Sequence, residues 1–360
     1  MKIKELNRFL KSVMPLELAF DWDNIGLLIG DGEEDLTKVL LTLDVTSAAV
    51  DKAIKEKCNL ILSHHPLIFG KINKINNPLY LKLIRARIDV ISMHTNLDSI
   101  PTGVNKVLAE RLGLTKLRFI SSECGNSVYW GKVFVPAAYY QILVEAISKA
   151  GAGIYPNYTN CFVNHEVKGS FIPGELANPT IGESGREEVV EELELQFRVD
   201  KANLQRVTSA IILNHPYETP VYNFTEIIDD NINYGSGMVG ELAAELDLKE
   251  FAQLVKTNLQ APFVKVWNAG KSETKIKRVA VCGGSGSFLI QLAMAKSDVI
   301  VTGDVTYHTM LDSTLPIIDA GHFYTENPVL DYLEELLTSQ QIESVKLLAS
   351  EHEIKNLTIL

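Results

Sequence analysis

The sequence predicts an α/β domain in two segments, residues 1–125 and 229–360, interrupted by a ferredoxin-like α+β domain at 126–228. Three observations lead to this fold class. In the outer segments, short continuous apolar runs alternate with helical patterns, which is typical of a parallel sheet covered by helices on both faces. In the middle segment, the expected elements follow the order βαββαβ, the split pattern of ferredoxin-like domains. A chain of 360 residues also exceeds what one core normally supports.

The first segment begins with a helix over residues 1–15, where apolar residues recur at helical spacing until Pro15 ends the pattern. Strands and helices then alternate along the segment. Strands are expected at 38–44, 59–63 and 89–93, and helices at 47–57, 78–87 and 104–112. Ser47 is a candidate N-cap, and Gly113 ends the third of these helices.

The middle segment changes character near Gly125. Residues 192–199 alternate strictly between polar and apolar side chains, as a half-exposed strand does. The remaining strands are expected at 130–136, 161–172 and 220–227, and the helices at 140–150 and 202–213. A loop rich in glycine, proline and glutamate, residues 173–188, is expected on the surface.

The last segment returns to the pattern of the first. Residues 234–240 are expected to form a loop, and a second glycine-rich loop at 283–287 lies between a strand and a helix. Strands are expected at 278–282, 298–302 and 316–320, and helices at 248–259 and 328–337. Asn327 is the expected N-cap of the final helix, with Pro328 at its first position.

The composition excludes several classes of protein. The net charge is −11, from 34 basic and 45 acidic residues, so general binding to nucleic acid or to an anionic membrane is disfavoured. The four cysteines form no CxxC pair, which indicates reduced thiols rather than a zinc ribbon or a disulfide scaffold. Because no signal-peptide core and no apolar run of about 20 residues is present, we expect a cytoplasmic protein.

Residues that can bind a metal follow four of the expected strands. They are His64 and His65, His94 and Asp98, Asp304 and His308, and His322 and Glu326. Ligands of open α/β sheets bind beyond the carboxyl ends of the strands, so these side chains are expected at one site. Mixed imidazole and carboxylate donors suit zinc, iron or manganese better than magnesium or calcium. Two such ions about 3.5–4 Å apart, bridged by a carboxylate, could activate hydroxide for hydrolysis.

Several of these residues have a second interpretation. His322 and Glu326 share the four-residue spacing of one helix face, but Pro328 places both on the loop before the helix, with Glu326 just ahead of the cap. His94 is either a ligand or a core group that supports one. Three other histidines are expected to be structural or exposed: His165, His215 and His352.

Two polar loops also remain open. Asp21, Asp23 and Asn24 could reach a site, although turn residues are the favoured interpretation. The loop at 283–286 could cradle a phosphate through its backbone N–H groups, or it could be a plain tight turn between a strand and a helix.

Five stretches carry a resemblance to a known family. They are Trp22–Leu27, Ser63–Pro66, His94–Asp98, Thr302–His308 and Asp319–Glu326. Together they span nearly the whole chain in the family's order. The sequence resembles the NGG-interacting-factor-like family, whose members carry the name GTP cyclohydrolase 1 type 2 homolog.

The resemblance implies a dinuclear metal site. Together with the donor types, it leads us to expect two divalent metal ions per subunit, zinc in the first place and iron or manganese as alternatives. Its implied ligands are His64, His65, Asp98, His322 and Glu326, with Glu326 as the bridging carboxylate. It also implies a toroidal homohexamer whose sites face an inner cavity. The middle segment resembles the PII/CutA-like domain of longer bacterial members, and residues 215–220 resemble the motif near its end.

We therefore expect a metal-dependent hydrolase that acts on a nucleotide or a related small molecule, with ring opening of GTP as the named candidate. Glu326 is the expected catalytic carboxylate, and His308 or Asp304 would orient ligands or shuttle protons. Two alternatives stay open: a metal-binding regulatory or assembly protein without turnover, and a phosphoesterase that uses the same two metals.

Overall fold

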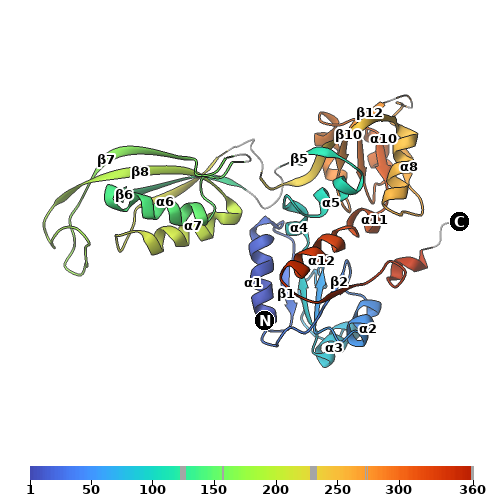
Figure 1. The fold of residues 1–360 in the computed structure, drawn as a ribbon, viewed down its shortest axis with the longest axis horizontal. Helices are drawn as coiled ribbons and strands as arrows, with labels where there is room; N and C mark the ends of the chain where they lie inside the picture. Colours follow the sequence, from blue (N-terminus) through green and yellow to red (C-terminus); the bar gives the residue numbers. More distant parts are fainter. Residues whose placement is uncertain (122–126, 156–157, 228–232, 272, 274, 358–360) are drawn as a thin grey trace. The chain divides into compact units, whose positions relative to one another are not determined.

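The computed structural model describes residues 1–121, 127–155, 158–227, 233–271, 273 and 275–357. The chain divides into two compact units (Figure 1). We call Met1–Gly125 together with Tyr234–Leu360 the outer unit, and Asn126–Asn233 the inserted unit. The predicted fold class, an α/β domain in two segments with a ferredoxin-like insertion, is confirmed.

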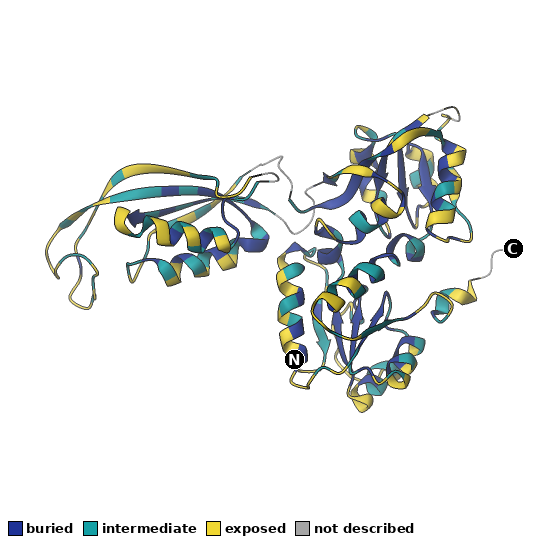
Figure 2. Cartoon of the chain, in the orientation of Figure 1, coloured by how far each residue is buried: buried dark blue, intermediate teal, exposed yellow. Residues whose placement is uncertain are grey.

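The first sheet of the outer unit has five strands in the order β1-β4-β3-β2-β15. The four strands from β4 to β15 run parallel, and β1 lies antiparallel to β4 at one edge. These strands are β1 (Gly26–Ile29), β2 (Val39–Thr42), β3 (Leu60–Ser63), β4 (Asp89–Ser92) and β15 (Ser344–Lys346). Every residue of β2, β3 and β4 is buried (Figure 2), which explains their continuous apolar sequences.

Helices alternate along the chain with these strands, as predicted. They are α1 (Ile3–Val13), α2 (Ser47–Lys55), α3 (Pro78–Ala86), α4 (Thr95–Ser99), α5 (Val104–Arg111) and α12 (Val329–Ser339). The buried residues of α2 and α3, among them Val50 and Leu83, form one core with Leu40, Ile61 and Val90 of the strands. The predicted cap of α2 is one residue too late, because the Thr46 hydroxyl accepts the Ala49 N–H.

The second sheet of the outer unit has six strands in the order β11-β14-β13-β12-β10-β5. Its three central parallel strands are β12 (Lys275–Val281), β13 (Val299–Thr302) and β14 (Ile317–Asp319), and antiparallel strands flank them. The flanking strands are β5 (Thr115–Ser121), β10 (Ser236–Asp247) and β11 (Lys265–Trp267). One face of this sheet packs on α5 and α8 (Leu248–Asn258). The opposite face packs on α9 (Ile290–Met294) beside α10 (Tyr307–Asp312).

The prediction of a loop at 234–240 is wrong, because Ser236 begins the long strand β10. Glycines in this stretch permit close backbone packing rather than a loop. A Cβ on Gly235 would lie 2.1 Å from the Ser121 carbonyl oxygen, and one on Gly240 would lie 2.9 Å from the Thr115 carbonyl oxygen. A glycine inside a strand often marks such an approach.

The inserted unit has the ferredoxin-like order of strands, β7-β8-β6-β9, with every neighbouring pair antiparallel. Its strands are β6 (Val128–Pro136), β7 (Phe162–Phe171), β8 (Glu188–Asp200) and β9 (Tyr222–Ile227), and its helices are α6 (Tyr140–Lys149) and α7 (Lys201–Asn214). Leu143 and Ile147 of α6 and Val207 of α7 pack with Leu195 and Phe197 of β8 in one core.

Short elements complete the described chain. They are the 3-10 helices η1 (Leu16–Leu18), η2 (Ala137–Tyr139), η3 (Ser287–Leu289) and η4 (Glu353–Asn356), and helix α11 (His322–Glu326). Within the described ranges, no helix combines the length and the apolar character needed to cross a membrane. Cys58, Cys161 and Cys282 carry free thiols, and Cys124 lies outside the described residues.

Candidate metal centre

Five side chains able to bind a metal meet where strands of both outer sheets end. His64 and His65 follow β3, Asp98 lies on α4 after β4, and His322 and Glu326 are the first and last residues of α11 after β14. We call these five residues the donor cluster. Because each follows the carboxyl end of a parallel strand, the cluster lies where open α/β sheets normally bind ligands.

His322 and Glu326 lie on a helix, so the prediction that they occupy a loop is wrong. Gly321, with a φ of +84°, is the N-cap of α11, which is a separate helix of five residues. The next helix, α12, begins only at Val329 with Pro328 as its N-cap, and not at Pro328 as predicted. The helical spacing brings His322 Nε2 within 3.1 Å of Glu326 Oε2.

Four imidazoles at this site are held in the same way, through Nδ1. The partners are the Met93 carbonyl for His64 (3.0 Å), Asp44 for His65 (2.8 Å), Asp23 for His94 (3.0 Å) and Asp304 for His322 (2.7 Å). All four partners are oxygen acceptors, so each Nδ1 carries a proton and donates it. Nε2 is then the atom that a metal would bind, as in carboxylate-supported metal sites.

Glu326 is buried and lies between the imidazoles. Its Oε2 is 3.0 Å from His65 Nε2 and 3.1 Å from His322 Nε2. Its Oε1 faces a different ring, 3.7 Å from His64 Nε2. The two carboxylate oxygens therefore serve two different groups of nitrogen donors.

Two buried atoms of the donor cluster have no hydrogen-bond partner among the described residues. They are His64 Nε2 and Asp98 Oδ1, which lie 3.6 Å apart. A buried polar atom left without a partner destabilises the fold by about 1–3 kcal/mol. A divalent cation bound by both atoms would remove this cost, so the residues present fit a metal ion.

The donor atoms form two overlapping groups whose members lie within 4.8 Å of one another. One group is His64, His65 and His94, and the other is His65, His322 and Glu326. His65 belongs to both groups. His94, whose role the sequence left open, thus lies near enough to act as a donor.

Charge interactions in the cluster are strong. Burial opposes the charged form of His65, but hydrogen bonds to Asp44 and Glu326 raise its pKa to about 10. Burial likewise opposes charge on His322, and Glu326 and Asp304 raise its pKa to about 9. Burial alone would raise the pKa of Glu326, yet the surrounding imidazoles hold it well below its usual value. A metal must therefore displace protons from Nε2 in order to bind.

The glycine-rich loop at 283–286 packs against the cluster. A Cβ on Gly284, whose φ is +62°, would lie 2.2 Å from Glu326 Oε1. Side-chain oxygens of Asn105, Thr325 and Thr302 accept the N–H groups of residues 283, 284 and 286 respectively. Because these three N–H groups already have partners, the hydrogen bonds of the loop favour the tight turn over the phosphate cradle.

Exposed aromatic rings adjoin the histidines. Trp22 and Phe69 are 62% and 61% exposed, yet both contact the His94 ring, with centroid distances of 5.9 and 6.2 Å. Phe20 stacks on Trp22 at 5.9 Å. Exposed aromatic rings beside a polar site offer flat apolar surfaces to a ligand.

Comparison with known proteins decides the family. The model of the family described as Duf34/NIF3 (NGG1p interacting factor 3) matches residues 1–355. The chain belongs to this family. A curated relative from Staphylococcus epidermidis, named GTP cyclohydrolase 1 type 2 homolog, is 38% identical over 347 residues, which cover 94% of this chain and 93% of the relative.

Solved structures of similar proteins agree with this NIF3-family assignment. A crystal structure of a Bacillus cereus protein related to NIF3 has a TM-score of 0.81 at 32% identity and covers 96% of both chains. A crystal structure of a Staphylococcus aureus protein has a TM-score of 0.74 at 32% identity and covers 100% of this chain and 99% of its own.

Two further carboxylates belong to this NIF3-family site: sequence reasoning left the role of Asp23 open and missed Asp44. Asp23, for which a turn role is favoured, accepts hydrogen bonds from His94 and from the Thr95 N–H and hydroxyl. Asp44 supports His65 and lies 3.3 Å from His352 Nε2. The available signal for Asp44 was its place two residues after the buried strand β2, which is close to the signal that singled out His64 directly after β3.

The predicted catalytic residues lie in different surroundings. Glu326 is central to the donor cluster, and Asp304 contacts it through the His322 Nδ1. His308 lies on α10 with an exposed side chain, and its ring contacts Tyr307. Of the remaining histidines, His165 is exposed, while His215 and His352 are buried.

Proposed function

We propose that this protein is a hydrolase with a centre of two divalent metal ions and acts on a nucleotide or a related small molecule. The arrangement of Glu326 carries the proposal: its two oxygens face different imidazoles, His64 on one side and His65 with His322 on the other. A carboxylate placed in this way can bridge two ions. The proposed ligands are His64, His65, Asp98, His322 and Glu326. Their mixed imidazole and carboxylate donors favour zinc, iron or manganese over magnesium or calcium, and zinc is the first candidate of the three.

Two bound ions would supply Lewis acidity and a nucleophile at neutral pH. The chain's own residues would then fix the geometry. Asp44 and Asp304 hold the rings of His65 and His322 through Nδ1, and Asp23 holds His94. Glu326 is proposed as the carboxylate essential for turnover. Asp304 and the exposed His308 are the candidates for moving a proton to or from the substrate.

A planar heterocycle is the substrate class that the surroundings favour. Trp22 and Phe69 expose aromatic faces next to His94, where a nucleobase could stack. The curated relatives carry a name that points to GTP. Ring opening of GTP needs a nucleophile at C8 of the purine and a proton donor for the departing imidazole nitrogen.

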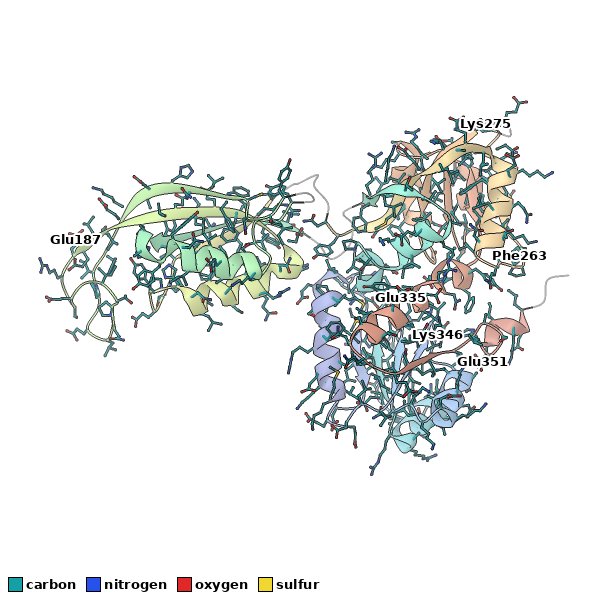
Figure 3. The ribbon with its side chains drawn as sticks, viewed as in Figure 1. Glu187, Phe263, Lys275, Glu335, Lys346 and Glu351 are labelled. Atoms are coloured by element: carbon teal, nitrogen blue, oxygen red, sulfur yellow. The ribbon has the colours of Figure 1, made fainter. Side chains whose placement is uncertain are left out.

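The activity is tested by incubating the metal-reconstituted protein with GTP and measuring GTP loss and product mass by LC-MS. Glu326→Ala should abolish turnover. Glu335→Ala is the matched control, because Glu335 lies exposed on the neighbouring helix α12 (Figure 3). Formate with a ring-opened product, absent only in Glu326→Ala, supports the proposal.

Two other results would favour a different function. Release of phosphate instead of formate would indicate a phosphoesterase that uses the same residues. No change in GTP, together with bound metal that exchanges freely, would indicate a metal-binding regulatory or assembly protein without turnover. Each of these outcomes would reject GTP ring opening.

The resemblance to the family also leads us to propose a cytoplasmic homohexamer with a PII/CutA-like inserted unit. Its support is the set of shared motifs, such as His64–Pro66 and residues 319–326. Light scattering coupled to size-exclusion chromatography measures the assembly directly. A mass of six chains is expected, and a monomer at micromolar concentration would reject it.

A further inference from the structure

The inserted unit contains a pocket that the metal centre does not use. Its volume is about 510 Å³, within the usual range for small-molecule sites. The ends of β6 and β7, residues 172–181 of the following loop, Glu192 of β8 and the segment before β9 form its walls. Every residue of its lining belongs to the inserted unit, so a ligand bound here would be independent of the proposed hydrolase activity.

The walls are mainly apolar and include aromatic rings. The apolar lining residues are Phe134, Val167, Phe171, Ile172, Pro173, Ala177, Pro179, Ile181 and Val221. Phe171 and Tyr217 contact one another with ring centroids 6.0 Å apart. Two hydrogen bonds attach the loop to the opposite wall: the Thr180 hydroxyl donates to the Pro216 carbonyl, and the Asn178 N–H donates to Glu218.

The charge inside the pocket is negative. Glu192 Oε1 accepts the Tyr217 hydroxyl at 2.8 Å, and its Oε2 has no hydrogen-bond partner among the residues that the structure describes. That oxygen lies against the backbone, since a Cβ on Gly169 would be 2.6 Å from it. Glu218 adds a second carboxylate to the lining.

Positive charge in the lining is weak by comparison. Lys168 is the one basic residue among the described lining residues, and its side chain is 72% exposed, 4.0 Å from Glu191 outside the pocket. An anionic ligand such as a phosphate would therefore meet Glu192 and Glu218 without a buried cation to balance it. A cation carried on an apolar body matches both the carboxylates and the aromatic wall.

We infer that this pocket binds a small organic amine in its ammonium form, with Glu192 as the counter-ion and Phe171 and Tyr217 against its apolar or aromatic body. Glu192 Oε2 supplies the free acceptor for the ammonium group. The Tyr217 hydroxyl fixes the carboxylate through Oε1, and Gly169 leaves the space in which Oε2 lies. The ligand class is thus set by charge as well as by volume.

The test uses the full-length protein and three probes of one shape: 2-phenylethylammonium, the neutral 2-phenylethanol and the anionic 3-phenylpropionate. Saturation-transfer NMR and titration calorimetry measure their binding. We expect the ammonium probe to bind best, and Glu192→Gln to weaken it about tenfold or more. Glu191→Gln is the matched control, because this substitution removes the same charge from a side chain that is 88% exposed.

A second variant guards against misfolding of Glu192→Gln. Ile181→Trp should fill the pocket from the loop and abolish binding while leaving Glu192 in place. Equal binding of the ammonium probe to wild type and Glu192→Gln would overturn the inference, as would preferred binding of 3-phenylpropionate. No binding of any probe to the wild type at millimolar concentration would overturn it as well. In that case, an oligomeric mass of Ile181→Trp that differs from the mass of the wild type would indicate a second copy of the chain as the occupant.

Discussion

At the scale of single residues, the candidate site depends on carboxylates that hold the imidazoles. Asp44 accepts the Nδ1–H of His65 and lies beside His352, so removing it frees the ring that both donor groups share. Asp44→Ala should weaken zinc binding about 10–100-fold. Competition with a fluorescent chelator measures this. Asp51→Ala, which removes an exposed carboxylate paired with Lys82, should leave the affinity unchanged.

Alanine substitutions at two glycines can separate the effect of backbone strain from the effect of steric crowding against Glu326. Gly284 and Gly270 both have positive φ, +62° and +73°, but only a Cβ on Gly284 meets Glu326, while one on Gly270 meets nothing within 4 Å. Alanine should therefore destabilise both sites through strain by about 1 kcal/mol, and Gly284→Ala should also reduce metal content. Elemental analysis and thermal unfolding test the two effects. Equal metal content in both variants would contradict the role given to Gly284.

Metal affinity should depend on pH. The pKa values of His65 and His322 are raised to about 10 and 9, so below pH 9 a metal must displace protons from both rings. The affinity should therefore rise steadily from pH 6 to about pH 10, the pKa of His65, and level off above it. Calorimetric titration of zinc in buffers of different ionisation enthalpy measures both the affinity and the proton release. A pH-independent affinity with no released protons would contradict the assignment.

At the scale of elements, His215 ties the end of α7 to β6. Its Nε2 donates to the Phe134 carbonyl at 2.7 Å and its Nδ1 accepts the Tyr217 N–H at 3.1 Å, so the ring is neutral in the folded chain. Burial lowers its pKa, which the bond to Phe134 offsets only in part. Below pH 6.5 the unfolded chain therefore binds more protons than the folded chain. The inserted unit should lose stability as the pH falls from 6.5 through the lowered pKa of His215 in the folded chain.

Hydrogen exchange measured by mass spectrometry follows this effect in the full-length protein. After correction for intrinsic rates, peptides from α7 and β9 should exchange faster at pH 5 than at pH 7. Peptides from β12 and β13, which contain no histidine and belong to the outer unit, serve as the internal reference. Equal protection of α7 at both pH values would contradict the role of His215.

The sequence predicted most elements because buried parallel strands and amphipathic helices leave strong local patterns. The strands before His64 and His94 are examples, since every residue of β3 and β4 is buried. It failed at β10, where glycines serve close backbone packing, and at α11, a single helical turn ahead of Pro328. In both places the structure depends on contacts with segments far away in the chain, which local patterns do not contain.

At the scale of the whole molecule, the donor cluster unites two sheets from segments more than 200 residues apart. The sequence could identify its members, because each follows a strand, but it could not supply their distances. It also could not show that Asp23 and Asp44 support the rings, since a carboxylate after a strand or in a turn has many ordinary roles. The chain's membership of the NIF3 family rests on the match over residues 1–355 and is independent of those details.

The proposed metal centre consists of two ions in the donor cluster, bridged by Glu326. Anomalous diffraction from crystals of the zinc-reconstituted protein, recorded on both sides of the zinc edge, tests it most directly. Two peaks about 3.5–4 Å apart are expected with Glu326 between them, one near His64 and Asp98 and the other near His65 and His322. Peaks elsewhere, or none at this cluster, would contradict it.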